Sequence, residues 1–145
     1  MPSEAFRATA TTTSDPVTAW EAMQQPEVWE GIAGVEHVTD PEFHPDGSLA
    51  RFRLAAIAAG KSYPGVAEVI ESTPGRTMKL RLSTSELAAT VALSLRASDQ
   101  GTHLTIDVDM RTSTFMASLF FPVVAGVIGR GLPTAAEDFA RRIDR

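Results

Sequence analysis

The sequence predicts an α+β fold, in which seven antiparallel strands pack against one long C-terminal helix. Apolar and polar residues alternate along seven segments, which is typical of strands with one buried face and one wet face. Residues 115–129, FMASLFFPVVAGVIG, carry no charge, and the charged residues 135–145 follow them. This uncharged run is shorter than the roughly 20 apolar residues that span a bilayer. We therefore expect it to be the buried half of a long helix.

Length and charge narrow the class of protein. The 145 residues suit one domain, 1–145, with its own core. A net charge of −5 without a basic cluster argues against nucleic acid as a partner. There is no cysteine, and hence no disulfide or thiolate chemistry. The first residues lack the features of a signal peptide, so we expect a cytoplasmic protein without stable membrane insertion.

The first part of the chain predicts a strand and two helices. Alternation and threonines indicate a strand at residues 4–13. Asp15 can cap the helix that follows, because its carboxylate accepts backbone N–H bonds, and Pro16 suits the first helical position. Pro26 ends this helix. A second short helix is expected at residues 27–31.

Six strands and the long helix make up the rest. The strands are expected at residues 35–43, 50–58, 63–71, 78–82, 87–96 and 104–110, and most of the breaks between them carry short glycine- or proline-containing turn signals. Such a sheet must bury its dry face, and the helix at residues 113–145 can cover it. Pro122 and Pro133 predict kinks in that helix.

Several short motifs in this order resemble a known family. They are Asp15-Pro16 before Ala19-Trp20, Pro26 to Trp29, Glu68-Val69-Ile70-Glu71 before Pro74, and Asp99-Gln100-Gly101-Thr102 before the last strand. The chain resembles the START-like, or Bet v 1-like, superfamily (SRPBCC), which includes polyketide cyclase/dehydrase and lipid-transport proteins. From residue 98 onward it looks most like small actinobacterial members. The resemblance implies a helix-grip fold, with a curved sheet wrapped around the C-terminal helix and two short helices between the first two strands.

The resemblance also implies a cavity between the sheet and the helix. Inward residues of the strands and three helix positions are the candidates for binding a ligand there: Phe52, Leu54, Tyr63, Ala67, Leu80, Leu82, Val91, Leu93, Leu104, Ile106, Phe115, Leu119 and Val123. Apolar alternation indicates burial without separating a pocket from a filled core. For each residue, a place in a pocket wall and a place in the filled core both stay open. Small inward residues such as Gly65, Ala89 and Gly126 favour open space.

Few residues suggest catalysis or metal binding. The family supplies no catalytic signature, and we assign no catalytic residue. Tyr63, Glu71 and His37 are the only groups that an enzyme of this kind could use at the cavity, and we expect the Tyr63 hydroxyl to lie in water. The three histidines lie in separate elements without metal-ligand spacing, so no metal or other cofactor is expected.

Three functions remain after these observations. The leading one is binding or carriage of a hydrophobic small molecule, such as a lipid, a polyketide or an aromatic compound. We expect that ligand to enter near residues 43–49 and 72–76, with helix bending at residues 129–133. The alternatives are a polyketide cyclase or dehydratase, and a toxin-like interaction protein of a toxin–antitoxin pair. A homodimer is compatible with each.

Overall fold

A computed structural model of the chain describes residues 3–58, 60–112 and 115–144, with the backbone alone at residues 58 and 115–120. Its elements are β1 (Ser3–Thr12), α1 (Pro16–Met23), η1 (Pro26–Trp29), η2 (Ile32–Gly34), β2 (Val35–Phe43), β3 (Leu49–Ala58), β4 (Lys61–Thr73), β5 (Thr77–Thr84), β6 (Leu87–Ser98), β7 (Gly101–Thr112) and α2 (Phe115–Ile143). This order matches the predicted one.

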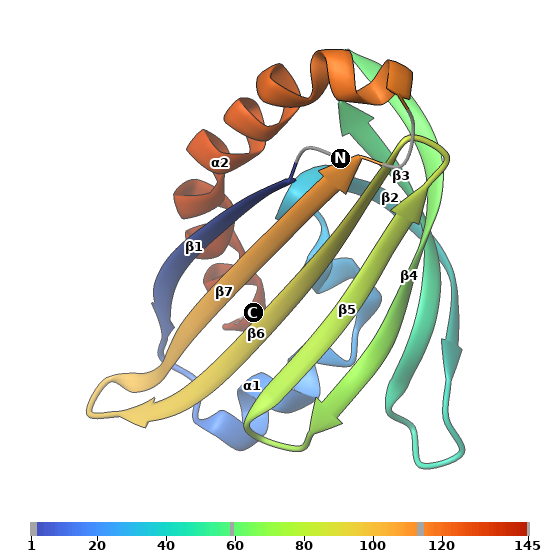
Figure 1. Ribbon diagram of the computed structural model, residues 1–145. Helices are drawn as coiled ribbons and strands as arrows, with labels where there is room; N and C mark the ends of the chain where they lie inside the picture. The colour runs from blue at the N-terminus through green and yellow to red at the C-terminus, as the bar shows by residue number, and fades with distance from the viewer. Residues whose placement is uncertain (1–2, 59, 113–114, 145) are drawn as a thin grey trace.

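The strands form one antiparallel sheet in the order β1-β7-β6-β5-β4-β3-β2. Hairpins join β2 through β7 in sequence, whereas β1 pairs with β7. The sheet curves around α2, which packs mainly against β1 (Figure 1). The predicted α+β helix-grip class is thereby confirmed.

The segment between β1 and β2 follows the predicted capping chemistry. The Asp15 carboxylate accepts a 2.7 Å hydrogen bond from the Thr18 backbone N–H, and Pro16 begins α1. The predicted helix at residues 27–31 is instead the two 3₁₀ turns η1 and η2, separated at Gly31, whose φ is 91°. Trp29 is buried there and donates from its ring nitrogen to the Met23 carbonyl at 3.0 Å.

β2 is an irregular edge strand. His37 and Asp40 both have a φ of 49°, and the pairing with β3 shifts near them. Few non-glycine residues adopt this left-handed conformation, and it interrupts the ladder of backbone hydrogen bonds. The irregular edge is a poor template for pairing with another strand.

α2 runs as one helix through both prolines and curves around the end of the sheet (Figure 1). Its buried positions follow a helical period and face the core: Phe121, Val124, Ala125, Leu132, Ala136, Phe139, Ala140 and Ile143. Within the described part of the chain, no helix combines the length and apolarity needed to cross a membrane.

Candidate functional site

An apolar pocket lies under the first half of α2. Its described lining comes from η2, from α2 and from five of the strands, β2, β3, β5, β6 and β7: Ala33, Val35, Leu54, Ala56, Ile57, Leu82, Thr84, Leu87, Ala88, Ala89, Met110 and Ile128. The strand register places it at the end of the sheet where Gly65 pairs with Thr84 and Leu87 with Thr112. The hairpin turn at residues 74–76 lies at the other end of β4 and β5. The expected entrance there is therefore distant from the pocket.

The pocket is small because side chains nearly fill it. Its volume is about 30 Å³, which is room for one or two water molecules, whereas drug-sized ligands occupy roughly 300 Å³ or more. Alanines at positions 33, 56 and 89 leave this space. Gly65 does not add to it, since a Cβ atom there would lie 2.6 Å from the Ser83 carbonyl oxygen. A ligand larger than water therefore requires part of this lining to move, and α2 is one of the elements that border the space.

The predicted ligand-binding residues divide into groups. Leu54 and Leu82 line the pocket. A larger group is at most 1% exposed in the core beneath it: Phe52, Ala67, Leu80, Val91, Leu93, Leu104 and Ile106. These side chains would contact a ligand that enters more deeply, and their role stays a prediction.

The remaining candidates are Tyr63 and the three helix positions. Tyr63 is half-buried and packs on the core. Val123 is 61% exposed, so the structure places it on the solvent side of α2 rather than facing the sheet. Ile128, which the sequence analysis did not select, is the described α2 residue at the pocket. The side chains of Phe115 and Leu119 lie outside the described residues.

Polar chemistry is scarce in the pocket. Thr84 is the only polar side chain in the described lining, and its hydroxyl bonds to the backbone of residues 86 and 87 in the β5–β6 turn. Tyr63, Glu71 and His37 do not line the pocket, and Glu71 and His37 are exposed. No three histidine, aspartate or glutamate side chains of the described chain gather into a metal-binding group.

The C-terminal end of α2 is held by a carboxylate. Asp144 accepts hydrogen bonds from the Thr12 hydroxyl, from the Thr13 and Ser14 backbone N–H groups at 3.2 Å each, and from the Ser14 hydroxyl at 3.0 Å. Desolvation raises the pKa of this carboxyl, but these hydrogen bonds outweigh it and lower the pKa from 3.8 to about 2. The charged carboxylate thus ties the end of α2 to the β1–α1 connection.

Two further contacts hold the same half of the helix. Arg142 donates to the Glu30 carbonyl, and the Phe139 ring lies 5.0 Å from the Trp29 ring. By contrast, Val123 and Val127 in the first half are 61% and 56% exposed. The described contacts of the second half thus include hydrogen bonds and a ring contact, whereas Phe121, Val124 and Ala125 of the half over the pocket pack by apolar burial.

Comparison with known proteins identifies the fold. A scan against protein-family models found no match, and a search of curated protein sequences found none either. Among solved structures, the chain is similar to the protein TTHA0849 of Thermus thermophilus, with a TM-score of 0.75 and 13% identity over 97% of both chains.

Two other similar structures have descriptive names. The aromatase/cyclase Zhui of Streptomyces sp. R1128 has a TM-score of 0.72 and 15% identity, covering 99% of this chain and 97% of its own. A START superfamily protein of Mycobacterium smegmatis has the same score and identity, over 96% and 98%. The chain therefore has the START-like, or Bet v 1-like, fold. Identities this low establish the fold alone.

Proposed function

We propose that this chain binds or carries a hydrophobic small molecule between the sheet and α2. The observation that carries the proposal is the apolar pocket under the first half of the helix. Because the only polar group in the described lining already bonds to the backbone, a ligand would be held by burial, worth about 25 cal/mol per Å² of apolar surface. The ligand part that enters is accordingly a hydrocarbon or aromatic group.

On this proposal, α2 moves when the ligand binds. The second half of α2 is tied by Asp144 and Arg142, so the first half is the part that moves. Residues 129–133 include two glycines and Pro133, and they are the point where the helix would bend. Hydrogen exchange tests this directly. Amides of residues 121–128 should exchange at least about tenfold faster than those of residues 135–142, an opening difference of about 1.4 kcal/mol. Uniform protection along α2 would contradict the movement.

The ligand is best identified by native mass spectrometry of protein purified from its native host. A bound lipid, quinone or aromatic product would support the proposal and give the ligand class. Bare protein from several hosts would count against it.

A substitution tests whether that ligand occupies this pocket. Ala56→Leu fills the pocket and should weaken binding about tenfold, because the added side chain takes the ligand's space. Ala55→Leu is the matched control, since Ala55 neighbours Ala56 on the strand and does not line the pocket. Fluorescence titration with the identified ligand measures both. Equal affinities in the two variants would place the ligand elsewhere.

The enzyme alternative has less support. A similar structure is an aromatase/cyclase, which makes a polyketide or aromatic ligand reasonable for this fold. A cyclase or dehydratase needs an acid or base within reach of its substrate. None of the three candidate groups lines the pocket, so we rank catalysis below binding.

The interaction alternative rests on exposed valines of α2. Val123 and Val127 lie one turn apart and are both more than half exposed. Together they offer far less surface than the roughly 800 Å² per partner that a stable complex buries. We therefore also rank a toxin-like partner-binding role, or a homodimer through this face, below ligand binding. Sedimentation velocity compares wild type with the Val123→Ser/Val127→Ser variant. If wild type self-associates and the variant does not, the partner-binding role ranks above ligand binding.

A further inference from the structure

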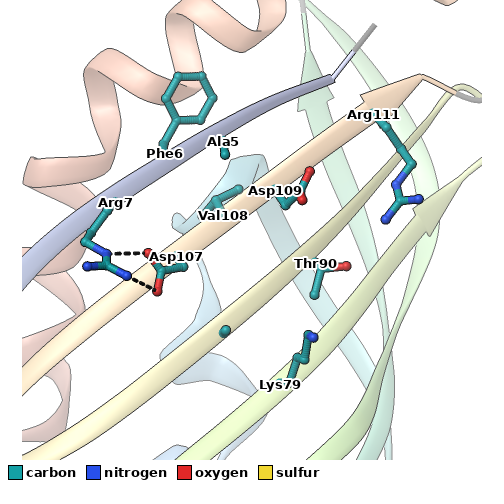
Figure 2. A pocket seen from close by; sticks show the side chains of 10 residues that line it. Ala5, Phe6, Arg7, Lys79, Thr90, Asp107, Val108, Asp109 and Arg111 are labelled. Atoms are coloured by element: carbon teal, nitrogen blue, oxygen red, sulfur yellow. Dashed lines mark hydrogen bonds and ion pairs between the residues drawn. The ribbon is translucent and has the colours of Figure 1, made fainter. Parts of the chain in front are cut away.

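The outer face of the sheet, opposite α2, carries two adjoining hollows along β6 that share Lys79, Thr90 and Arg111, and together they form one polar hollow (Figure 2 shows the side chains of the larger part). Its floor is formed by the outward residues Ala88, Thr90 and Ala92, which are all small. Longer charged side chains of the two neighbouring strands form its walls: Lys79 and Arg81 on β5, and Asp107, Asp109 and Arg111 on β7. The hollow exists because short side chains lie between long ones.

Ion pairs occupy some of these charges. Arg7 donates to both carboxylate oxygens of Asp107, at 2.6 and 3.2 Å. Arg81 lies 3.7 Å from a carboxylate oxygen of Glu68. Among the described residues, Lys79 and Arg111 have no carboxylate within ion-pair distance. Figure 2 shows these two side chains reaching toward Thr90 from opposite sides.

Lys79 and Arg111 thus flank the Thr90 hydroxyl on the outer face of the sheet. Like charges that share a sheet face repel each other. Glu71, opposite Lys79 across the strand pair, and Asp109, on the same strand face as Arg111, offset part of this repulsion without reaching ion-pair distance of either cation. An oxyanion between them would accept hydrogen bonds from the guanidinium, the ammonium and the Thr90 hydroxyl together.

We propose that Lys79, Thr90 and Arg111 form a binding site for a single phosphate group. Asp109 lies on the same wall as Arg111 and limits the negative charge that the hollow accepts. This carboxylate disfavours a long polyanion such as nucleic acid and favours one phosphate on a small molecule or a lipid headgroup. The site is independent of the apolar pocket, because the two lie on opposite faces of the sheet.

Inorganic phosphate is the first probe. It is titrated into isotope-labelled protein at constant ionic strength, while amide chemical shifts are recorded. Amides of residues 79, 90 and 111 should shift with saturation in the millimolar range. The Lys79→Gln/Arg111→Gln variant should bind at least about tenfold more weakly, because two charge-assisted hydrogen bonds are lost.

The control is the Arg51→Gln/Arg53→Gln variant. It removes two exposed cations of the same sheet face, which pair with Glu42 and Asp40 on β2. Its affinity for phosphate should stay within about twofold of wild type, since long-range screening leaves distant surface charges little influence. Unfolding curves of both variants check that each is folded.

Several outcomes would overturn the proposal. They are no saturable shift in wild type, equal affinity in the two double variants, or the same shifts when chloride replaces phosphate. Vesicles that contain phosphatidic acid then distinguish the source of the phosphate. Vesicle binding that the Lys79→Gln/Arg111→Gln variant loses indicates a lipid headgroup. Phosphate binding without vesicle binding indicates a free phosphorylated molecule.

Discussion

The two halves of α2 differ in a way that their composition does not suggest. The first half, residues 115–129, is uncharged, yet Val123 and Val127 are exposed to solvent. The second half carries the charges, yet Phe139 and Ala136 are completely buried and Asp144 is bonded to the β1–α1 connection. Apolar content is thus a poor measure of how firmly a helix is held. Specific contacts hold the second half, and the pocket lies under the first.

Removing a core side chain from the second half should have the largest effect. Phe139→Ala deletes a fully buried ring that contacts Trp29 and should lower the free energy of unfolding by about 3–5 kcal/mol. Val127→Ala, in the first half, should cost less than about 0.5 kcal/mol because Val127 is mostly exposed. Urea denaturation measures both. Phe139→Leu, a milder change, serves if the alanine variant fails to fold. Similar losses at positions 127 and 139 would show that burial does not set the cost of substitution at these two positions.

Two glycines between the halves should respond with opposite signs. A Cβ atom at Gly129 would lie 2.4 Å from the Phe6 ring, so Gly129→Ala should cost about 1–3 kcal/mol through overpacking. Nothing lies within 4 Å of a Cβ at Gly131, and Gly131→Ala should add about 0.5–1 kcal/mol through helix propensity. Thermal unfolding compares the two. Adding Phe6→Leu should recover part of the Gly129→Ala loss, and no recovery would show that the ring is not the cause.

Acid should loosen the second half through Asp144. Its pKa is about 2 in the folded chain and 3.8 without these contacts, so its stabilisation is complete above pH 3.8. The stabilisation falls as the pH drops from 3.8 toward 2, because the carboxyl becomes protonated. Allowing for its exposure to solvent, Asp144→Asn should cost about 1 kcal/mol at pH 7.

The pH dependence of the stability difference between wild type and Asp144→Asn is the smallest expected effect. The stability gap between wild type and Asp144→Asn should narrow as the pH falls through this window. Asp138→Asn, which breaks an exposed pair with Arg141, is the control and should cost less than about 0.5 kcal/mol. A gap that stays constant down to pH 2 would show that the Asp144 charge does not act as described.

Sequence reasoning succeeded where one residue's neighbours in the chain decide its structure. Alternation located the strands, because side chains of a strand point to opposite faces in turn. Asp15 and Pro16 located the start of α1 through local capping. The prediction for Val123 had no such support. Residues 115–129 are apolar on every side, so their pattern does not reveal which face meets the sheet.

The sequence by itself determined the α+β class, the order of the elements and the residues that point to the dry side of the sheet. Tertiary structure decided which of those residues fill the core and which, such as Ala56 and Ile128, border open space. It also brought Asp144 to Thr12, and Lys79 to the same hollow as Arg111. The physical reason is that alternation reports which side a residue faces. Free volume and the meeting of distant charges depend on how strands and helix pack together.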